Sequence, residues 1–245
     1  MIVCANCGET GSGKFCSACG QRLDPRLPTA QQWFAEVTDA FLNVDGRVAK
    51  TLRLLLTQPG TLTVDMIEGR RARHVSPLRL YLACSIVYFF VANVTPEQKR
   101  FMFATFDFGD GQNRWLAEAL PRLMFLLVPL VALLQKALFQ KQQPSYTAHL
   151  ISVLHLFSCW YLIFTLDRLF STPMMLDPIP WWAYPCAAVS VVLQVSGHVY
   201  FFFAMRRLFG QGVALTIGKQ FLWILGFSIL LALSVLALAA ATGHL

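Results

Sequence analysis

Residues 69–94 have the sequence GRRARHVSPLRLYLACSIVYFFVANV, and within them the chain changes from a basic to an apolar composition. Three arginines, Arg70, Arg71 and Arg73, precede Pro77, which fits the first turn of a helix because no backbone N–H is needed there. The apolar run that follows, 78–94, would rise about 1.5 Å per residue as a helix and just reach the thickness of a hydrocarbon core. This stretch therefore predicts a first membrane span with a basic segment in front of it.

The whole chain has the composition of an integral membrane protein. Of its 245 residues, 56% are hydrophobic and 13% are charged, whereas charged residues make up about 25% of a typical soluble domain. The apolar residues gather in four further runs, 120–139, 148–170, 182–205 and 221–241. We therefore predict an all-α membrane protein, with a five-helix transmembrane bundle in residues 77–245 and a water-exposed N-terminal part.

The distribution of basic residues predicts the orientation of these spans. Five spans place the two termini on opposite sides, and a cytoplasmic N-terminus leaves fifteen of the twenty Lys and Arg residues in the cytoplasm. Basic residues near span ends, chiefly Arg70, Arg71, Arg73, Arg206 and Arg207, favour this orientation under the positive-inside rule. Attraction of these membrane-surface residues to anionic membrane lipid then accounts for the net charge of +7. A nucleic-acid partner is not expected.

The N-terminus carries the spacing of a metal site. Cys4 and Cys7 form one Cys-x2-Cys pair followed by glycine, and Cys16 and Cys19 form a second. Two such knuckles on a short hairpin bring four thiolates together in the tetrahedral geometry that suits zinc. Two disulfides, or iron in the same four-sulfur site, are the alternatives. We predict a structural zinc ribbon in residues 1–22, whose four protein ligands leave no open position for catalysis.

Residues 23–76 are predicted to form a cytoplasmic amphipathic helical neck. Residues 29–32, Thr-Ala-Gln-Gln, fit a capping box. Apolar residues then recur at helical spacing, with polar residues between them: Trp33, Val37, Phe41, Val44, Val48, Leu52 and Leu55. Two interpretations are open: an interfacial helix pair on the bilayer, or a helical hairpin packed against the cytoplasmic ends of the bundle.

Four polar side chains fall in the cytoplasmic half of the predicted spans. They are His149 and His155 in the third span, and Gln194 and His198 in the fourth. Ionisable residues at membrane depth suggest a functional site, so we consider a possible intramembrane polar site that binds metal or haem or relays protons. The alternative is that each histidine stays neutral and bonds to a neighbouring helix.

Several motifs resemble an uncharacterised bacterial family of multi-pass inner-membrane proteins with an N-terminal zinc ribbon and a domain of unknown function. The residues that carry the resemblance are Cys4-x2-Cys7-Gly8, Phe15-Cys16-x2-Cys19-Gly20-Gln21, Pro59-Gly60, Gly69 with Arg71, Pro77 with Tyr81-Leu82, Tyr146, His149-Leu150, His155 and Tyr200. The resemblance covers nearly the full chain. It implies a location in the bacterial inner (plasma) membrane, where the charges predict a cytoplasmic N-terminus and an external C-terminus. It implies no activity.

Catalytic motifs are absent from the sequence: it has no nucleophile with a base, no paired carboxylates and no phosphate-binding loop. The sequence therefore leaves enzymatic activity undecided but favours a non-enzymatic anchor, sensor or scaffold whose ribbon docks a cytoplasmic protein partner. A transporter for a small solute, ion or lipid that uses the inner histidines is the second hypothesis. A histidine-dependent membrane enzyme or haem protein is the third.

Overall fold

The computed structural model describes residues 2–23, 47–94, 100–101, 104–105, 114–176 and 178–242. The described part is mostly helical. Its elements, in chain order, are β1 (Ile2–Val3), β2 (Thr10–Gly11), α2 (Arg47–Thr57), α3 (Thr61–Ile67), α4 (Pro77–Val94), β3 (Arg100–Phe101), β4 (Ala104–Thr105), α5 (Arg114–Phe139), α6 (Tyr146–Ser171), the 3-10 helix η1 (Thr172–Met175), α7 (Ala183–Phe209) and α8 (Val213–Thr242). The predicted neck helix upstream of α2 lies outside the described residues.

Four helical segments are long and apolar enough to cross a membrane: Ala119–Phe139, Tyr146–Met174, Ala183–Phe209 and Val213–Thr242. They correspond to four of the five predicted spans. The remaining prediction, 78–94, coincides with α4, whose continuous apolar stretch Pro77–Ala92 is shorter. At about 1.5 Å per residue this stretch does not reach across a core of about 30 Å, so the described residues contain four candidate spans where the sequence predicts five.

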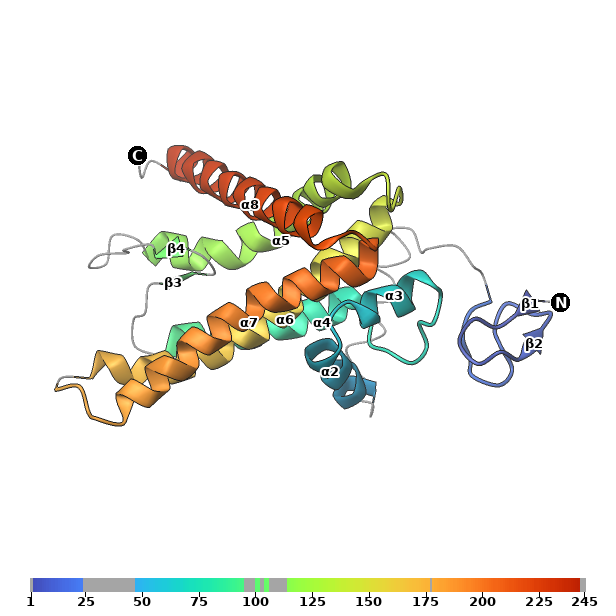
Figure 1. Ribbon diagram of the computed structural model, residues 1–245, viewed down its shortest axis with the longest axis horizontal. Helices are drawn as coiled ribbons and strands as arrows, with labels where there is room; N and C mark the ends of the chain where they lie inside the picture. The colour runs from blue at the N-terminus through green and yellow to red at the C-terminus, as the bar shows by residue number, and fades with distance from the viewer. Residues whose placement is uncertain are drawn as a thin grey trace.

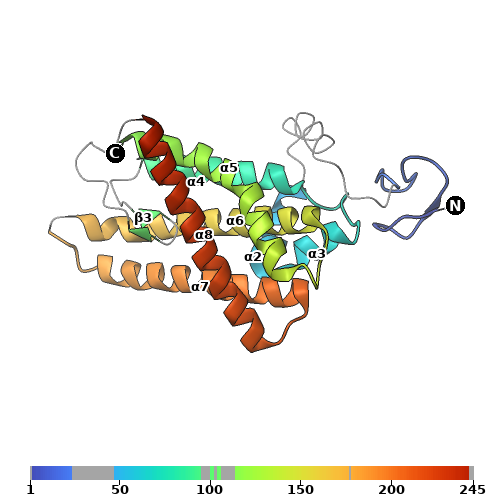
Figure 2. The same cartoon turned by 90° about the horizontal axis from the view of Figure 1, so that it is seen from above.

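Helix α6 is the centre of the bundle. It packs against α3, α4, α5 and α7, and Figure 2 shows it between α7 on one side and α4 and α5 on the other, with α8 crossing obliquely. Aromatic rings fill the space around it: Trp160 lies edge-on to Phe201, with ring centroids 5.7 Å apart, and equally close to Trp223. A helix that is apolar on every side is expected to be enclosed by other helices. Helix α6 is apolar in this way and is enclosed.

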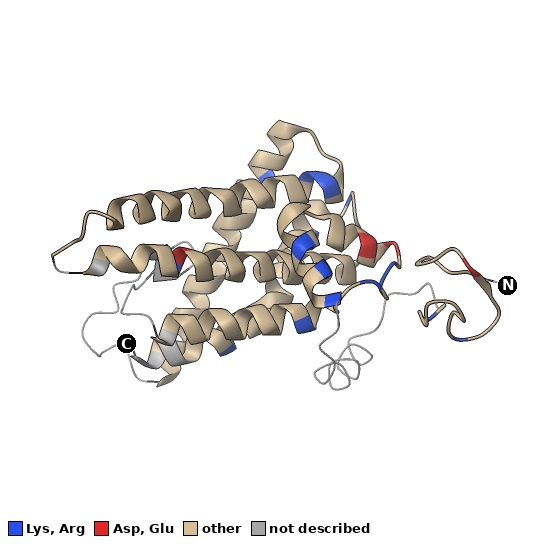
Figure 3. Cartoon of the chain, turned by 90° about the horizontal axis from the view of Figure 1, so that it is seen from below, with Lys and Arg blue, Asp and Glu red and all other residues tan. Residues whose placement is uncertain are grey.

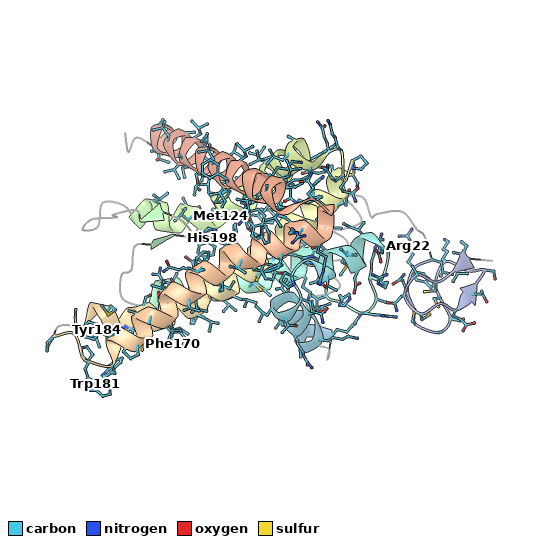
Figure 4. The ribbon with its side chains drawn as sticks, in the orientation of Figure 1. Arg22, Met124, Phe170, Trp181, Tyr184 and His198 are labelled. Carbon is cyan, nitrogen blue, oxygen red and sulfur yellow. The ribbon has the colours of Figure 1, made fainter. Side chains whose placement is uncertain are left out.

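Helices α7 and α8 instead face outward. Only 17% of the most apolar stretch of each is buried, against 72% for α6. Their exposed side chains include many that are aliphatic or aromatic, such as Val192, Val195, Leu233 and Leu236. At the end of the bundle remote from the N-terminal ribbon, Trp181 and Tyr184 are also exposed (Figure 4). This surface has the chemistry of a lipid-facing wall with an aromatic edge.

Helix α3 packs directly against α6 and α7, close to the start of α6 (Figure 1). The turn before it is held by Arg207, which donates to the Pro59 carbonyl at 3.1 Å and to the Thr61 hydroxyl. Gly60 in this turn has φ +78 and lies so close to α7 that an added Cβ would approach the Ala204 carbonyl to 3.0 Å. Helix α3 therefore packs against the bundle, whereas the first helix of the predicted neck pair lies outside the described residues, so the choice between the two interpretations of the neck stays a prediction.

We expect Gly60→Ala to destabilise the fold more than Gly210→Ala does. Both glycines have positive φ, but a Cβ at Gly210 meets nothing within 4 Å. Strain alone costs about 1–3 kcal/mol, and only Gly60→Ala adds a clash with the backbone of α7. Thermal unfolding of detergent-purified variants, followed by tryptophan fluorescence, measures the difference. Equal losses of stability in the two variants would contradict this packing.

Candidate metal centre

The four predicted metal ligands converge in the N-terminal ribbon. The Sγ atoms of Cys4, Cys7, Cys16 and Cys19 all lie within 4.8 Å of one another. Two pairs, Cys4 with Cys19 and Cys7 with Cys16, are 3.6 Å apart. Four sulfurs at about 2.3 Å from a tetrahedral ion would be separated by about 3.8 Å. The donor set and its spacing therefore fit a single four-coordinate metal ion.

Backbone geometry presents each pair of sulfurs in the same way. The Cys4 amide donates to the Glu9 carbonyl and the Gly8 amide to the Cys4 carbonyl, both at 2.8 Å. The second knuckle repeats this pattern, with Cys16 donating to Gln21 and Gly20 donating to Cys16. Gly8 and Gly20 have φ of 81 and 70, which side chains with a Cβ rarely adopt. Glycine after each Cys-x2-Cys pair is thus required by the turn.

The two knuckles place the thiols in unequal environments. Two hydrogen bonds lower the pKa of the Cys19 thiol to about 6: the larger effect comes from the Gln21 backbone amide and the smaller from the Asn6 side chain. At Cys7 the Glu9 backbone amide lowers the pKa, but desolvation and the neighbouring sulfurs outweigh it and raise the pKa to about 12. Four thiolates at this spacing repel one another, and a cation at their centre would remove that repulsion.

The ribbon is attached to the segment between α3 and α4, residues 69–76, which we call the basic loop. The Gln21 side chain donates to the Gly69 carbonyl at 2.6 Å and accepts from the backbone amides of Arg71 at 3.0 Å and Ala72 at 3.1 Å. The Arg73 guanidinium donates to the Asn6 carbonyl in the first knuckle. Both knuckles therefore contact the loop that leads into α4, as the position of the ribbon in Figure 1 indicates.

Asp65 in α3 organises the other side of the basic loop. Its carboxylate accepts from Arg70 at 2.7 Å and lies 2.9 Å from the Nε2 atom of His74, whose side chain is buried. Burial raises the pKa of Asp65, but the hydrogen bonds from Arg70 and His74 outweigh it and hold the pKa below its usual value. The loop is thus held between Asp65 and the ribbon.

The predicted membrane-surface arginines make intramolecular contacts. Arg70 pairs with Asp65, Arg71 donates to the Met66 carbonyl, and Arg73 bonds to the ribbon. At the end of α7, Arg206 lies over the Phe202 ring at 5.8 Å, and Arg207 holds the turn before α3. Much of this charge therefore serves to join the ribbon, α3 and α7.

The predicted intramembrane residues have separate partners. His155 Nδ1 lies 3.0 Å from the Thr63 hydroxyl in α3, and His149 Nε2 lies 2.8 Å from the Gln143 carbonyl. Gln194 donates to the Asp167 carboxylate at 3.2 Å. His198, labelled in Figure 4, accepts at its backbone carbonyl from Gln220. Among these contacts, only the one at His155 joins a histidine side chain to a separate helix; His149 bonds within the connection that precedes α6, and the contact with Gln220 uses the backbone of His198, so the choice between the two hypotheses stays a prediction.

Within the residues that the structure describes, the four ribbon cysteines are the only group of three or more His, Cys, Asp or Glu side chains that could hold a metal ion. The three histidines do not gather into such a group. No pattern in the sequence singles out the contact residues Asn6, Thr63 and Asp65. Gln21 was noticed only as part of a family motif, since a contact with Gly69 has no local signal in the sequence.

Comparison with known proteins gives one match. Residues 45–89, which include α2, α3, the basic loop and most of α4, match the family described as "Protein of unknown function (DUF3667)". No curated protein and no solved structure matches the chain. The matched segment contains Asp65, His74 and the part of the basic loop that the ribbon contacts, but it excludes the cysteines themselves.

We expect Asp65→Asn to lower stability at neutral pH by about 1–2 kcal/mol, because it removes charge-assisted hydrogen bonds to Arg70 and His74. A lowered folded-state pKa means that the carboxylate stabilises the fold above the unfolded-state pKa. This contribution disappears as pH falls through the folded-state pKa. The difference in melting temperature between wild type and variant should therefore shrink below about pH 4.

Glu68→Gln is the matched control, because Glu68 also contacts Arg70 but its side chain is 52% exposed. An exposed ion pair contributes little, so this variant should melt close to the wild type throughout the series. If the effect of Asp65→Asn stayed constant down to pH 3, the proposed role of the Asp65 charge would be wrong.

Proposed function

We propose that this protein is a non-enzymatic membrane anchor whose cytoplasmic zinc ribbon docks a protein partner. The observation that carries the proposal is the attachment of a closed four-cysteine centre to the loop that leads into the helical bundle. Such a centre has no open coordination position, so its metal would be structural. The ribbon would then be a folded recognition unit held at a fixed place beside the membrane.

The proposed ion is Zn²⁺, because four thiolates in tetrahedral spacing are its usual structural ligand set. A cytoplasmic location supports this choice over two disulfides, since thiols are kept reduced there. Residues Cys4, Cys7, Cys16 and Cys19 would hold the ion. Zinc binding would supply the free energy of folding that a ribbon of this size lacks.

The proposed orientation places the ribbon and the basic loop in the cytoplasm. Lys and Arg residues gather at the end of the bundle nearest the ribbon (Figure 3), which is the expected pattern for a cytoplasmic end. We propose that α4 completes a five-span bundle, because it packs along α6 and contains the buried Leu80, Tyr81 and Tyr88. Local thinning of the bilayer and snorkelling of flanking residues would accommodate its short length. The membrane would be a bacterial inner membrane, with the C-terminus outside.

The surface proposed to meet the partner lies on the ribbon. The ribbon has few apolar residues, and three of them are nevertheless exposed: Ile2 is 49% exposed, Val3 64% and Phe15 63%. Ile2 and Val3 form β1, whose only partner among the described residues is β2. Contiguous exposed apolar patches mark protein interaction sites, and we propose that these three side chains contribute to one.

The structure gives less support to transport through the inner histidines. The cavity beside His155 is lined also by Thr63, Ser152 and Tyr200, and its water-accessible volume is about 10 Å³. That is room for roughly one water molecule. A solute pathway would require a second conformation of the bundle.

Site-specific photo-crosslinking in cells tests the docking proposal. We expect a photoreactive amino acid at Phe15 to give a discrete adduct with one protein, because this side chain projects from the ribbon. The adduct should disappear in the Cys4→Ser/Cys7→Ser variant, whose ribbon cannot hold the metal.

The control position is Leu236, which is 52% exposed on α8 and is expected to face lipid. A photoreactive residue there should give no adduct with the same protein. Absence of any adduct from Phe15 and from Val3, in a protein that retains its metal, would contradict docking through the ribbon.

A further inference from the structure

The contact between the ribbon and the basic loop suggests how the metal centre could influence the membrane part of the chain. Gln21 lies two positions after Cys19, and its own backbone carbonyl closes the second knuckle by accepting from the Cys16 amide at 2.7 Å. The same residue uses its side chain to bond three backbone groups of the basic loop. Its position is thus fixed by the knuckle on one side and by the loop on the other.

The first knuckle provides a second attachment. Asn6 lies between Cys4 and Cys7, is buried, and accepts at its carbonyl from Arg73. Next to it, Ala5 is so close to Gly69 that a Cβ added to the glycine would lie 3.3 Å from the Ala5 Cβ. Each knuckle therefore contributes a contact, and both contacts require the backbone path that the four sulfurs define.

The basic loop transmits these contacts to the helices. The Val75 amide donates to the Thr51 hydroxyl in α2 at 3.1 Å, and His74 pairs with Asp65 in α3. Helix α3 in turn reaches the centre of the bundle, where Thr63 bonds to His155 in α6. A continuous series of hydrogen bonds thus leads from the ribbon through the loop into the bundle.

We propose that metal occupancy of the four-cysteine centre controls the conformation of the basic loop. This proposal rests on the proposed zinc ribbon. With the metal bound, the knuckles hold Gln21 and Asn6 against the basic loop. The arginines of the loop then stay in their intramolecular contacts. When the metal is removed, the knuckles unfold because four free thiols have no common centre. The amides of Arg71 and Ala72 then lose their bonds to Gln21, the Arg71 amide keeps only its bond to the Gly69 carbonyl at 3.0 Å, and Arg73 becomes available to anionic lipid.

Hydrogen exchange of the full-length protein in lipid nanodiscs tests this proposal at the two amides concerned. We compare zinc-loaded protein with protein treated with a zinc chelator, with reductant present in both samples. Chelation should make the amides of Arg71 and Ala72 exchange about tenfold faster, because each loses a hydrogen bond to Gln21. Exchange in the middle of α6 should stay unchanged.

Three variants separate the effect of the Gln21 contact from the effect of metal binding. Gln21→Ala should retain its zinc but show fast exchange at Arg71 and Ala72. Gln21→Glu keeps the oxygen acceptor for these two amides but loses the donor to the Gly69 carbonyl, so its exchange at Arg71 and Ala72 should lie between wild type and Gln21→Ala. Gln58→Ala removes an exposed glutamine at the end of α2 and should have no effect.

Two outcomes would overturn the proposal. Equal exchange at Arg71 and Ala72 in zinc-loaded and chelated wild type would show that the loop does not depend on the metal. Slow exchange in zinc-loaded Gln21→Ala would show that Gln21 does not hold the loop. In either case the zinc-loaded sample would still contain one zinc ion per chain, so the proposed ribbon would survive. Zinc-free wild type would instead remove the proposed function itself.

Discussion

The convergence of four sulfur atoms is the interaction on which the N-terminal part of the protein depends. Apart from the cysteines, the buried apolar core of the ribbon consists of Leu23, which is too little to offset the conformational entropy of ordering about twenty residues. The four sulfurs, with the metal ion that we propose they bind, would take the place of that core. Because Gln21 and Asn6 are positioned by the same two knuckles, the attachment to the basic loop also depends on the metal centre.

The membrane part obeys a different constraint, which is that a buried polar group needs a partner when water is absent. His155 reaches Thr63, Gln135 donates to Ser152 at 2.9 Å, and Asp167 accepts from Ser190. Each pair joins two separate helices, and all three pairs include a buried α6 residue: His155, Ser152 or Asp167. These polar pairs specify which helices pack against each other. Apolar contacts alone would leave that choice of neighbours poorly defined.

Local patterns in the sequence were sufficient for some of these features. The spacing of the four cysteines predicted the metal centre because both knuckles are formed within a few residues, and long apolar runs located four candidate spans. The contacts that assemble these parts were not predictable in this way. Gln21 and Gly69 are separated by 48 positions, and Thr63 and His155 by 92. Charge counts placed the arginines of the basic loop at the membrane surface. Such counts carry no information about the bonds that Asp65 and Asn6 make to these arginines in the folded chain.

X-ray absorption spectroscopy at the zinc edge, with elemental analysis of the same purified full-length protein, tests the central claim most directly. The account predicts one zinc per chain with four sulfur neighbours at about 2.3 Å, and loss of that signal in the Cys4→Ser/Cys7→Ser variant. A metal-free wild-type protein, or a metal bound by nitrogen and oxygen and retained in the variant, would contradict it. The second result would place the metal among other side chains and separate the ribbon from any metal-dependent role.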